Sequence, residues 1–218
     1  MLRIIFFVLA FTLSPSILAK CLLNLAAPTD ISVLSSEIKR LKRAYRRINC
    51  EINIHPMPAG RAIRQDNLDT TIDGEVVRFT NFSHIVPDFI MVEPAIAHMK
   101  VYAYTKKNLH SPISWQVLHD YSVATVRGYV MIEQHLFNHP NNLAVTDSAQ
   151  VISLLEKDRV DFAILPEPVA LFTDETIHKS HPVLLSEPLY HFLHKRNQHL
   201  VAPLSKALQT ELDALKPH

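Results

Sequence analysis

The segment "HPMPAGRAIRQDN", residues 55–67, places an arginine where it could bind an anion. Two prolines and a predicted turn at Gly60 restrict the backbone that leads to Arg61, so little conformational freedom is lost when its side chain engages a ligand. A guanidinium is permanently charged and can donate two parallel hydrogen bonds to one carboxylate. A helix that starts here would add free N–H groups. The pattern predicts that Arg61 binds an anion, with local pairing to Asp66 or Asp69 as the alternative.

Further polar side chains are candidates for the same site. Arg78 ends the stretch "DGEVVR", and Arg127 and Tyr129 flank the glycine of "VRGY". Two carboxylates, Glu75 and Glu167, complete the set of predicted ligand-binding residues. A carboxylate with a raised pKa in a cleft would be typical of an enzyme. A solvated loop charge is the ordinary interpretation of both glutamates.

The histidines do not form a metal-binding pattern. The chain contains 13 of them, and several occur in close pairs: His135 and His139, His178 and His181, His191 and His194. No pair has an evident third ligand at metal-site spacing, so solvated or capping roles are favoured. The sequence also lacks a glycine-rich phosphate loop and a G-x-S-x-G motif. We therefore predict no metal, no cofactor and no catalytic residue.

Residues 1–19 are predicted to be a cleaved signal peptide. Arg3 precedes the apolar stretch "IIFFVLAFTL", and Ala19 offers a small residue at the cleavage site. Ten apolar residues are too few to span a bilayer comfortably. The sequence "LAKC" resembles a lipoprotein cleavage box, but Lys20 stands where a small residue is needed. We expect a soluble periplasmic protein, with a buried N-terminal helix as the alternative for this stretch.

Export makes a disulfide bond possible for the two cysteines. Cys21 opens "CLLNLAA", an apolar run typical of a buried strand, and Cys50 opens "CEINIH", which alternates like a second strand. Between them, apolar residues recur at spacings of three and four from Ile31 to Ile48, which predicts an amphipathic helix. Strand, helix and strand in this order favour parallel strands that begin side by side. We predict a Cys21–Cys50 disulfide, with two unpaired thiols as the alternative.

Strands alternate with helices along the rest of the chain, so the predicted class is α/β. The 22 basic and 21 acidic residues nearly balance, which gives no indication of nucleic acid as a partner. No apolar stretch after residue 19 is long enough for a membrane span. The basic residues between 39 and 47 are predicted to form a solvated helix face, with a docking face for a membrane partner as the alternative.

Three segments, in this order, resemble the type 2 periplasmic solute-binding proteins, in particular the family 3, amino-acid-binding-like group. They are "SWQVLHDYSVATVRGYVMIEQHL", "VTDSAQVISLLEKDRVDFAILPEPVALF" and "SEPLYHFLHKRNQHLVAPLSKALQTEL". The resemblance implies two lobes, each with a central mixed sheet, joined by a two-strand hinge. Lobe 1 would contain residues 20–97 and 186–218, and the inserted lobe 2 residues 98–185. The ligand would bind in the cleft at the carboxyl ends of the strands.

Two positions depart from the group's pattern. Many members present Gly-Thr at the second-lobe turn to bind a carboxylate, where this chain has Gly128 and Tyr129. Many carry an aspartate that binds an amino group, where this chain has Pro166 followed by Glu167. These departures argue against an α-amino acid ligand.

The resemblance implies a monomeric binding protein that captures a small carboxylate-bearing ligand for an inner-membrane ABC permease or a sensor. Two alternatives stay open. One is a periplasmic enzyme on the same scaffold, such as a dehydratase acting on a cyclic carboxylic acid, with Glu75 or Glu167 as the carboxylate of raised pKa. The other is a degenerate member that binds no small ligand and acts through protein contacts.

Overall fold

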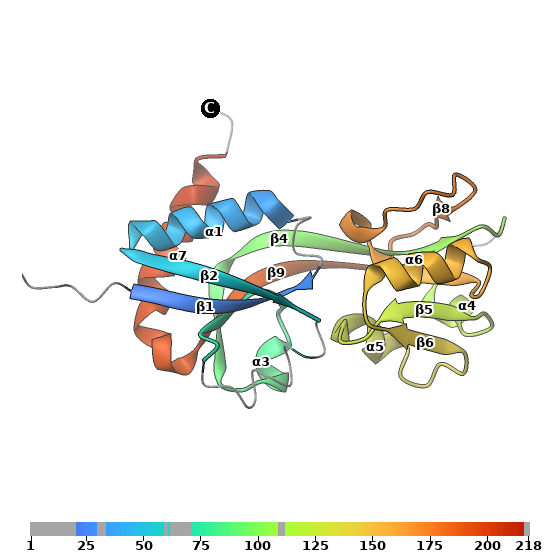
Figure 1. The fold of residues 1–218 in the computed structure, drawn as a ribbon, viewed down its shortest axis with the longest axis horizontal. Helices are drawn as coiled ribbons and strands as arrows, with labels where there is room; N and C mark the ends of the chain where they lie inside the picture. The colour runs from blue at the N-terminus through green and yellow to red at the C-terminus, as the bar shows by residue number, and fades with distance from the viewer. Residues whose placement is uncertain (1–20, 30–33, 59–60, 62–70, 109–111, 216–218) are drawn as a thin grey trace, which may run out of the picture.

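The computed structural model describes residues 21–29, 34–58, 61, 71–108 and 112–215, so the predicted signal peptide lies outside the described residues. Its helices and strands form two lobes that lie end to end (Figure 1). The elements are β1 (Cys21–Pro28), α1 (Ser35–Arg47), β2 (Cys50–Met57), β3 (Gly74–Phe79), α3 (Phe82–Ile85), β4 (Phe89–Thr105), α4 (Trp115–Leu118), β5 (Val123–Val126), α5 (Val130–His135), β6 (Asn142–Val145), α6 (Ser148–Glu156), β7 (Phe162–Pro166), η2 (Glu167–Val169), β8 (His178–Lys179), β9 (Leu185–His194), η3 (Lys195–Leu200) and α7 (Val201–Asp213).

Lobe 1 is built on the strands β2, β1, β3, β9 and β4, which are neighbours in that order. The helices α1 and α7 lie together beside this sheet, and α3 lies on the opposite side in Figure 1. Side chains from α1, α7, β1 and β3 share one apolar cluster, which includes Leu41, Leu204 and Val76. A second cluster, around Phe82 of α3 and Phe192 of β9, fills the other side of the sheet. The sheet is therefore covered on both faces, as expected in an α/β protein.

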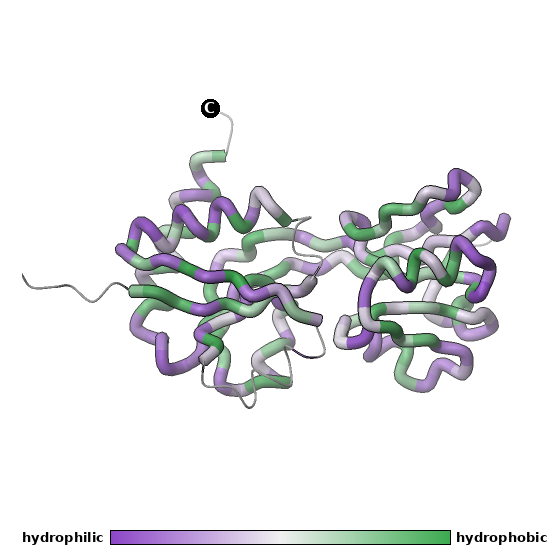
Figure 2. The backbone as a smooth tube through the Cα atoms, viewed as in Figure 1, coloured by the Kyte–Doolittle hydropathy of each residue, from purple (hydrophilic) through white to green (hydrophobic). Residues whose placement is uncertain are grey.

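The helix α1 shows why one face is buried and the other is basic. Leu41, Ala44 and Tyr45 fall at helical spacing and are completely buried. The colours along α1 in Figure 2 alternate between hydrophilic and hydrophobic residues accordingly. Arg43 and Arg47, on the other face, both bind Glu211 of α7, at 2.5 and 2.6 Å. Part of the predicted basic face therefore ties α1 to α7.

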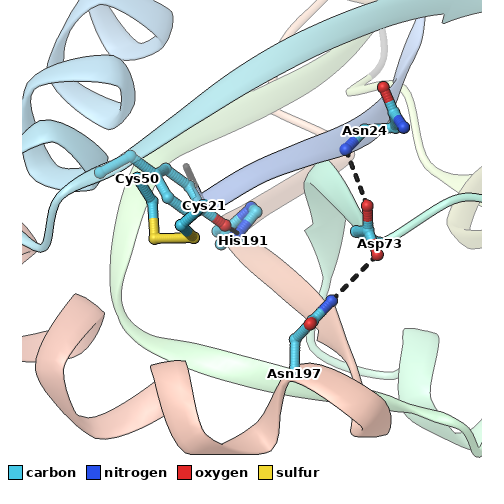
Figure 3. Close-up of a disulfide and its surroundings, with 7 residues drawn as sticks. Cys21, Asn24, Cys50, Asp73, His191 and Asn197 are labelled. Atoms are coloured by element: carbon cyan, nitrogen blue, oxygen red, sulfur yellow. Dashed lines mark hydrogen bonds between the residues drawn. A yellow bond between two sulfur atoms is a disulfide. The ribbon is translucent and has the colours of Figure 1, made fainter. Parts of the chain in front are cut away.

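The predicted disulfide bond is confirmed. The strands β1 and β2 are parallel, and Cys21 is the register partner of Cys50. Their sulfur atoms are bonded at 2.02 Å, and the bond joins the beginnings of the two strands (Figure 3). No other cysteine occurs in the sequence.

A single carboxylate, that of Asp73, holds β1, β3 and η3 together. It accepts a hydrogen bond from the backbone N–H of Asn24 at 2.9 Å and from the side-chain amide of Asn197 at 3.1 Å (Figure 3). Arg196 donates a further bond to it at 3.1 Å. Asp73 immediately precedes β3, so these contacts fix the point at which that strand enters the sheet.

Lobe 2 contains β7, β5 and β6 beside the far end of β4, which also pairs with β8. Val151 and Leu155 of α6 pack with Tyr102 and Tyr104 of β4 in one apolar cluster. The helices α4 and α5 contribute to a separate cluster that contains Phe162 of β7. The helix α5 ends at His135, and residues 136–138 form a turn after it.

The two lobes are joined by β4 and β9, which run antiparallel as a ladder with one irregularity. The ladder pairs Phe89–Val92 of β4 with β9 in lobe 1 and resumes at Ala97, where the partner is Leu189. The ladder is interrupted at Glu93-Pro94, although β4 itself continues through this step. The strands of both lobes consequently form one nine-stranded sheet. None of the described helices is long and apolar enough to cross a membrane.

Candidate functional site: an interlobe cleft

A cleft of about 800 Å³, including its open mouth, lies between the two lobes. Lobe 1 contributes Phe79 of β3 and Phe82 and Ile85 of α3, and lobe 2 contributes Tyr129, Val130 and Pro166. Most of the described wall is apolar. Its hydrogen-bonding side chains are those of Arg78, Asn81 and Tyr129. A concave, largely apolar cavity with a few polar groups is typical of a small-molecule site.

Arg78 is the charged residue of the described wall, and it is held from two sides. Its side chain is nearly buried, and one terminal nitrogen, Nη2, donates to Oε1 of Glu75 at 2.9 Å. The guanidinium carbon lies 5.1 Å from the centre of the Phe82 ring, within the range of a cation–π contact. The buried Nε–H group has no hydrogen-bond partner among the described residues. Arg78 therefore combines a place in the cleft wall with one buried donor that no described residue satisfies.

Glu75 is not the solvated loop charge that the ordinary interpretation of the sequence suggested. It lies inside β3 and its exposed fraction is 0%. One carboxylate oxygen binds Arg78, and the other, Oε2, has no hydrogen-bond partner among the described residues. A buried carboxylate and guanidinium in contact offset each other's desolvation cost. Glu75 is not part of the described wall. It contacts Arg78, which is.

A β-bulge brings these two side chains together. Residues three apart on a regular strand point to opposite faces of the sheet. In β3, Glu75 faces Phe192 of β9 whereas Arg78 faces Tyr190, so three steps along β3 match two steps along β9. The extra residue re-aims the strand, which is how bulges often act at functional sites. No motif in the sequence indicated this bulge.

Arg61 lies at a helical position and its side chain is exposed. Its backbone N–H donates to the carbonyl of Pro58 at 2.8 Å. Its neighbours in sequence on both sides lie outside the described residues. Arg61 is not among the described residues of the cleft wall, so its contact with a ligand stays a prediction.

The turn between β5 and α5 places Gly128 and Tyr129 in the cleft wall. Gly128 has a φ of 89°, a backbone conformation that residues other than glycine rarely adopt. Its N–H donates to Oε1 of Glu133 at 2.9 Å, so the protein itself occupies this donor. The adjacent Arg127 is exposed and donates to the carbonyl of Ala144 at 2.9 Å, and it is not among the described wall residues.

Glu167 is directed to a surface ion pair. Its carboxylate lies 2.5 Å from Nζ of Lys179, and this hydrogen bond lowers the pKa of Glu167. The prediction that Glu167 could be a carboxylate of raised pKa is therefore wrong. Lys179 also lies over the ring of Tyr102, with Nζ 4.5 Å from the ring centre. The preceding residue, Pro166, lines the cleft instead.

Asn81 is a wall residue that the sequence did not single out. Its side-chain amide, in lobe 1, donates to Oε1 of Gln134 in lobe 2 at 3.4 Å. The contact exists only because the two lobes meet here, so no local pattern could have predicted it. Among the described residues, no three histidine, cysteine, aspartate or glutamate side chains come together as a metal site would require.

The comparisons with known proteins agree on the fold. By sequence, no protein-family model and no curated protein matches the chain. By structure, it is similar to holo ArgBP from T. maritima, with a TM-score of 0.71, 17% identity, and coverage of 87% of this chain and 89% of that one. AbpA from Streptococcus pneumoniae, an amino acid ABC transporter substrate-binding protein bound to L-arginine, has a TM-score of 0.73 at 16% identity, with 89% and 90% covered.

A third similar structure is the ancestral amino acid-binding protein AncCDT-1, described as a precursor of cyclohexadienyl dehydratase. Its TM-score is 0.69 at 14% identity, with 88% of this chain and 90% of that chain covered. The protein thus has the two-lobed type 2 periplasmic binding protein fold, along nearly all of its described length.

Proposed function

We propose that the protein binds a small carboxylate-bearing ligand in the interlobe cleft and presents it to an inner-membrane ABC permease or a sensor. The observation that carries this proposal is Arg78, a nearly buried guanidinium in the cleft wall with an Nε–H that has no partner among the described residues. A buried donor without a partner is costly, so a ligand that accepts from it gains more than the bond itself. The protein acts as an exported periplasmic monomer in this proposal.

A carboxylate suits this donor better than a neutral acceptor does. Hydrogen bonds between a guanidinium and a carboxylate are charge-assisted, and they are stronger than bonds between neutral groups. Glu75 holds one terminal nitrogen of Arg78, and the guanidinium carbon lies against the Phe82 ring, so its orientation is largely fixed before a ligand arrives. Little side-chain entropy is then lost on binding.

In this proposal Arg61 and Arg127 attract the anionic ligand towards the cleft. Both side chains are exposed. Positive charges near a cleft raise the local concentration of an anion and its rate of association. Closure of the lobes by bending of the crossing strands then completes the site.

A dehydratase-like enzyme is the second candidate, because AncCDT-1 is described as the precursor of such an enzyme. Acid–base catalysis needs a carboxylate or histidine within reach of the substrate. Glu75 is buried and bound to Arg78, Glu167 is bound to Lys179, and the described wall contains no Asp, Glu or His. Binding without chemistry is therefore the better-supported proposal.

The experiment is a thermal-shift screen of small carboxylates and their neutral amides, followed by calorimetry on the hits. A carboxylate ligand should raise Tm, since it binds the folded state alone, and its amide should bind more weakly. The matched variant is Glu75→Gln/Arg78→Gln, which removes both charges of the buried pair together. It should lose binding, whereas Lys206→Gln, exposed on α7, should keep it. Equal binding of a carboxylate by both variants would contradict the proposal.

A further inference from the structure

We infer that the ligand of this cleft is an apolar monocarboxylate that lacks an amino group, such as an aromatic or branched aliphatic acid. This inference rests on the proposed function and narrows its ligand class. The apolar wall indicates the body of the ligand. Phe79, Phe82 and Ile85 face it from lobe 1, and Tyr129 and Val169 face it from lobe 2.

The described wall offers no anionic side chain to pair with an ammonium group. It contains no Asp or Glu side chain. Pro166 ends β7 in the wall, and the nearby carboxylate of Glu167 is committed to Lys179 at 2.5 Å. An amino acid bound here would lose the hydration of its ammonium group without gaining an ion pair, and that loss is large for a charged group. The corresponding acid without the amino group avoids this cost.

The described wall residues also provide a cationic partner for one carboxylate and no more. Arg78 is the single charged residue among the described wall residues, and Glu75 already engages one of its terminal nitrogens. The backbone N–H of Gly128, in the turn between β5 and α5, already donates to Glu133 and is not open to a ligand. A second ligand carboxylate would therefore be buried without a cationic partner among the described wall residues. The same argument excludes a phosphorylated ligand, whose charge exceeds what one partly neutralised guanidinium can balance.

Matched pairs of ligands test the inference by calorimetry on the mature chain. The pairs are hydrocinnamate with L-phenylalanine and isocaproate with L-leucine, because the members of each pair differ only in the amino group. The acid should bind at least about tenfold more tightly than the amino acid in at least one pair, as expected when a buried charge is left unpaired. Hydrocinnamamide should bind more weakly than hydrocinnamate.

If the inference holds, one variant should shift the preference for the acid over the amino acid. Pro166→Asp introduces a carboxylate into the wall of lobe 2 and should raise the affinity for L-phenylalanine relative to hydrocinnamate. Lys157→Gln, at the exposed end of α6, is the matched control and should leave the ratio unchanged.

The outcomes separate the inference from the function on which it rests. Tighter binding of the amino acids, or binding of L-arginine but of none of the four probes, overturns the inference and leaves carboxylate capture standing. Equal binding of hydrocinnamate and its amide overturns the charged contact and with it both proposals. The absence of binding by any carboxylate in the screen also overturns both.

Discussion

The hydroxyl group of Tyr45 in α1 lies 2.7 Å from Nε2 of His191 in β9, and both side chains are completely buried. The two rings meet edge to face, with their planes at 87°. The pair joins the first helix to a strand that crosses between the lobes. Burial lowers the pKa of His191 from 6.5 to about 4.

The low pKa of His191 makes the stability of the protein depend on pH. The unfolded chain takes up a proton near pH 6.5, whereas folded His191 stays neutral down to about pH 4. The contribution of His191 to the free energy of unfolding is therefore fully present above pH 6.5. It is lost as the pH falls towards 4, by on the order of 3 kcal/mol. Urea unfolding at a series of pH values measures this loss.

The control for this prediction is His191→Gln, whose amide can still hydrogen-bond to Tyr45 but does not titrate. Between pH 6.5 and 4 its stability should fall less steeply than that of the wild-type protein. Parallel curves for the two proteins would show that His191 is not responsible for the acid sensitivity.

The buried pair of Glu75 and Arg78 predicts a second set of stabilities. Arg78→Met alone leaves the Glu75 carboxylate buried without its partner and should cost about 3–5 kcal/mol. The double variant Glu75→Leu/Arg78→Met removes both charges and should recover most of that loss. Unfolding in denaturant gives both values. If the double variant were as unstable as the sum of its single variants, the two residues would not be coupled.

The disulfide bond predicts a third measurement. It closes a loop whose ends are separated by 29 positions, between Cys21 and Cys50. Its loss should lower the free energy of unfolding by roughly 3–4 kcal/mol in the chain-entropy model. The test compares wild type with Cys21→Ser/Cys50→Ser, and with wild type under reducing conditions. A change below about 1 kcal/mol would mean that residual structure already constrains this loop in the unfolded chain.

Gly74, the first residue of β3, should not tolerate a side chain. A Cβ atom at this position would lie 2.5 Å from the carbonyl oxygen of Phe192 and 2.9 Å from a methyl group of Leu25. The oxygen belongs to the neighbouring strand β9 and cannot move aside independently. Gly74→Ala should therefore destabilise the protein by about 1–3 kcal/mol, as overpacking does. Thermal unfolding measures this loss. The comparison variant is Ala207→Gly, in the interior of α7, which destabilises through lower helix propensity and lost burial and not through overpacking.

The elements of this fold were largely predictable, because their signals are local. Apolar spacing located α1, and the starts of two strands placed Cys21 beside Cys50. The continuity of β4 through Glu93-Pro94 was not predictable in this way, because the ladder with β9 holds the strand on both sides of the break. Pairing with a distant segment overrides a local signal that would end a strand.

The site was harder to predict than the fold. Arg78 was among the candidates because it ends an apolar strand, but its partnership with Glu75 depends on a bulge against β9. Glu167 had the right residue type and lies next to the cleft, yet Lys179 draws its side chain away. Asn81 carries no sequence signal, since its contact with Gln134 requires both lobes to be in place. Residue types can be read from a sequence, but the direction of a side chain depends on its neighbours in space.

The crossing strands also make the two halves of this protein separable in sequence. Met99 and Glu187 are register partners, so the chain leaves lobe 1 and returns to it at adjacent points. A tight turn that joined them directly would delete lobe 2 and leave β2, β1, β3, β9 and β4 connected in their native order. Lobe 2 thus occupies the position of a long hairpin loop. The part of the cleft wall that lobe 2 contributes can be exchanged as one contiguous segment, by recombination or by design. The part that contains Arg78 then stays unchanged in lobe 1.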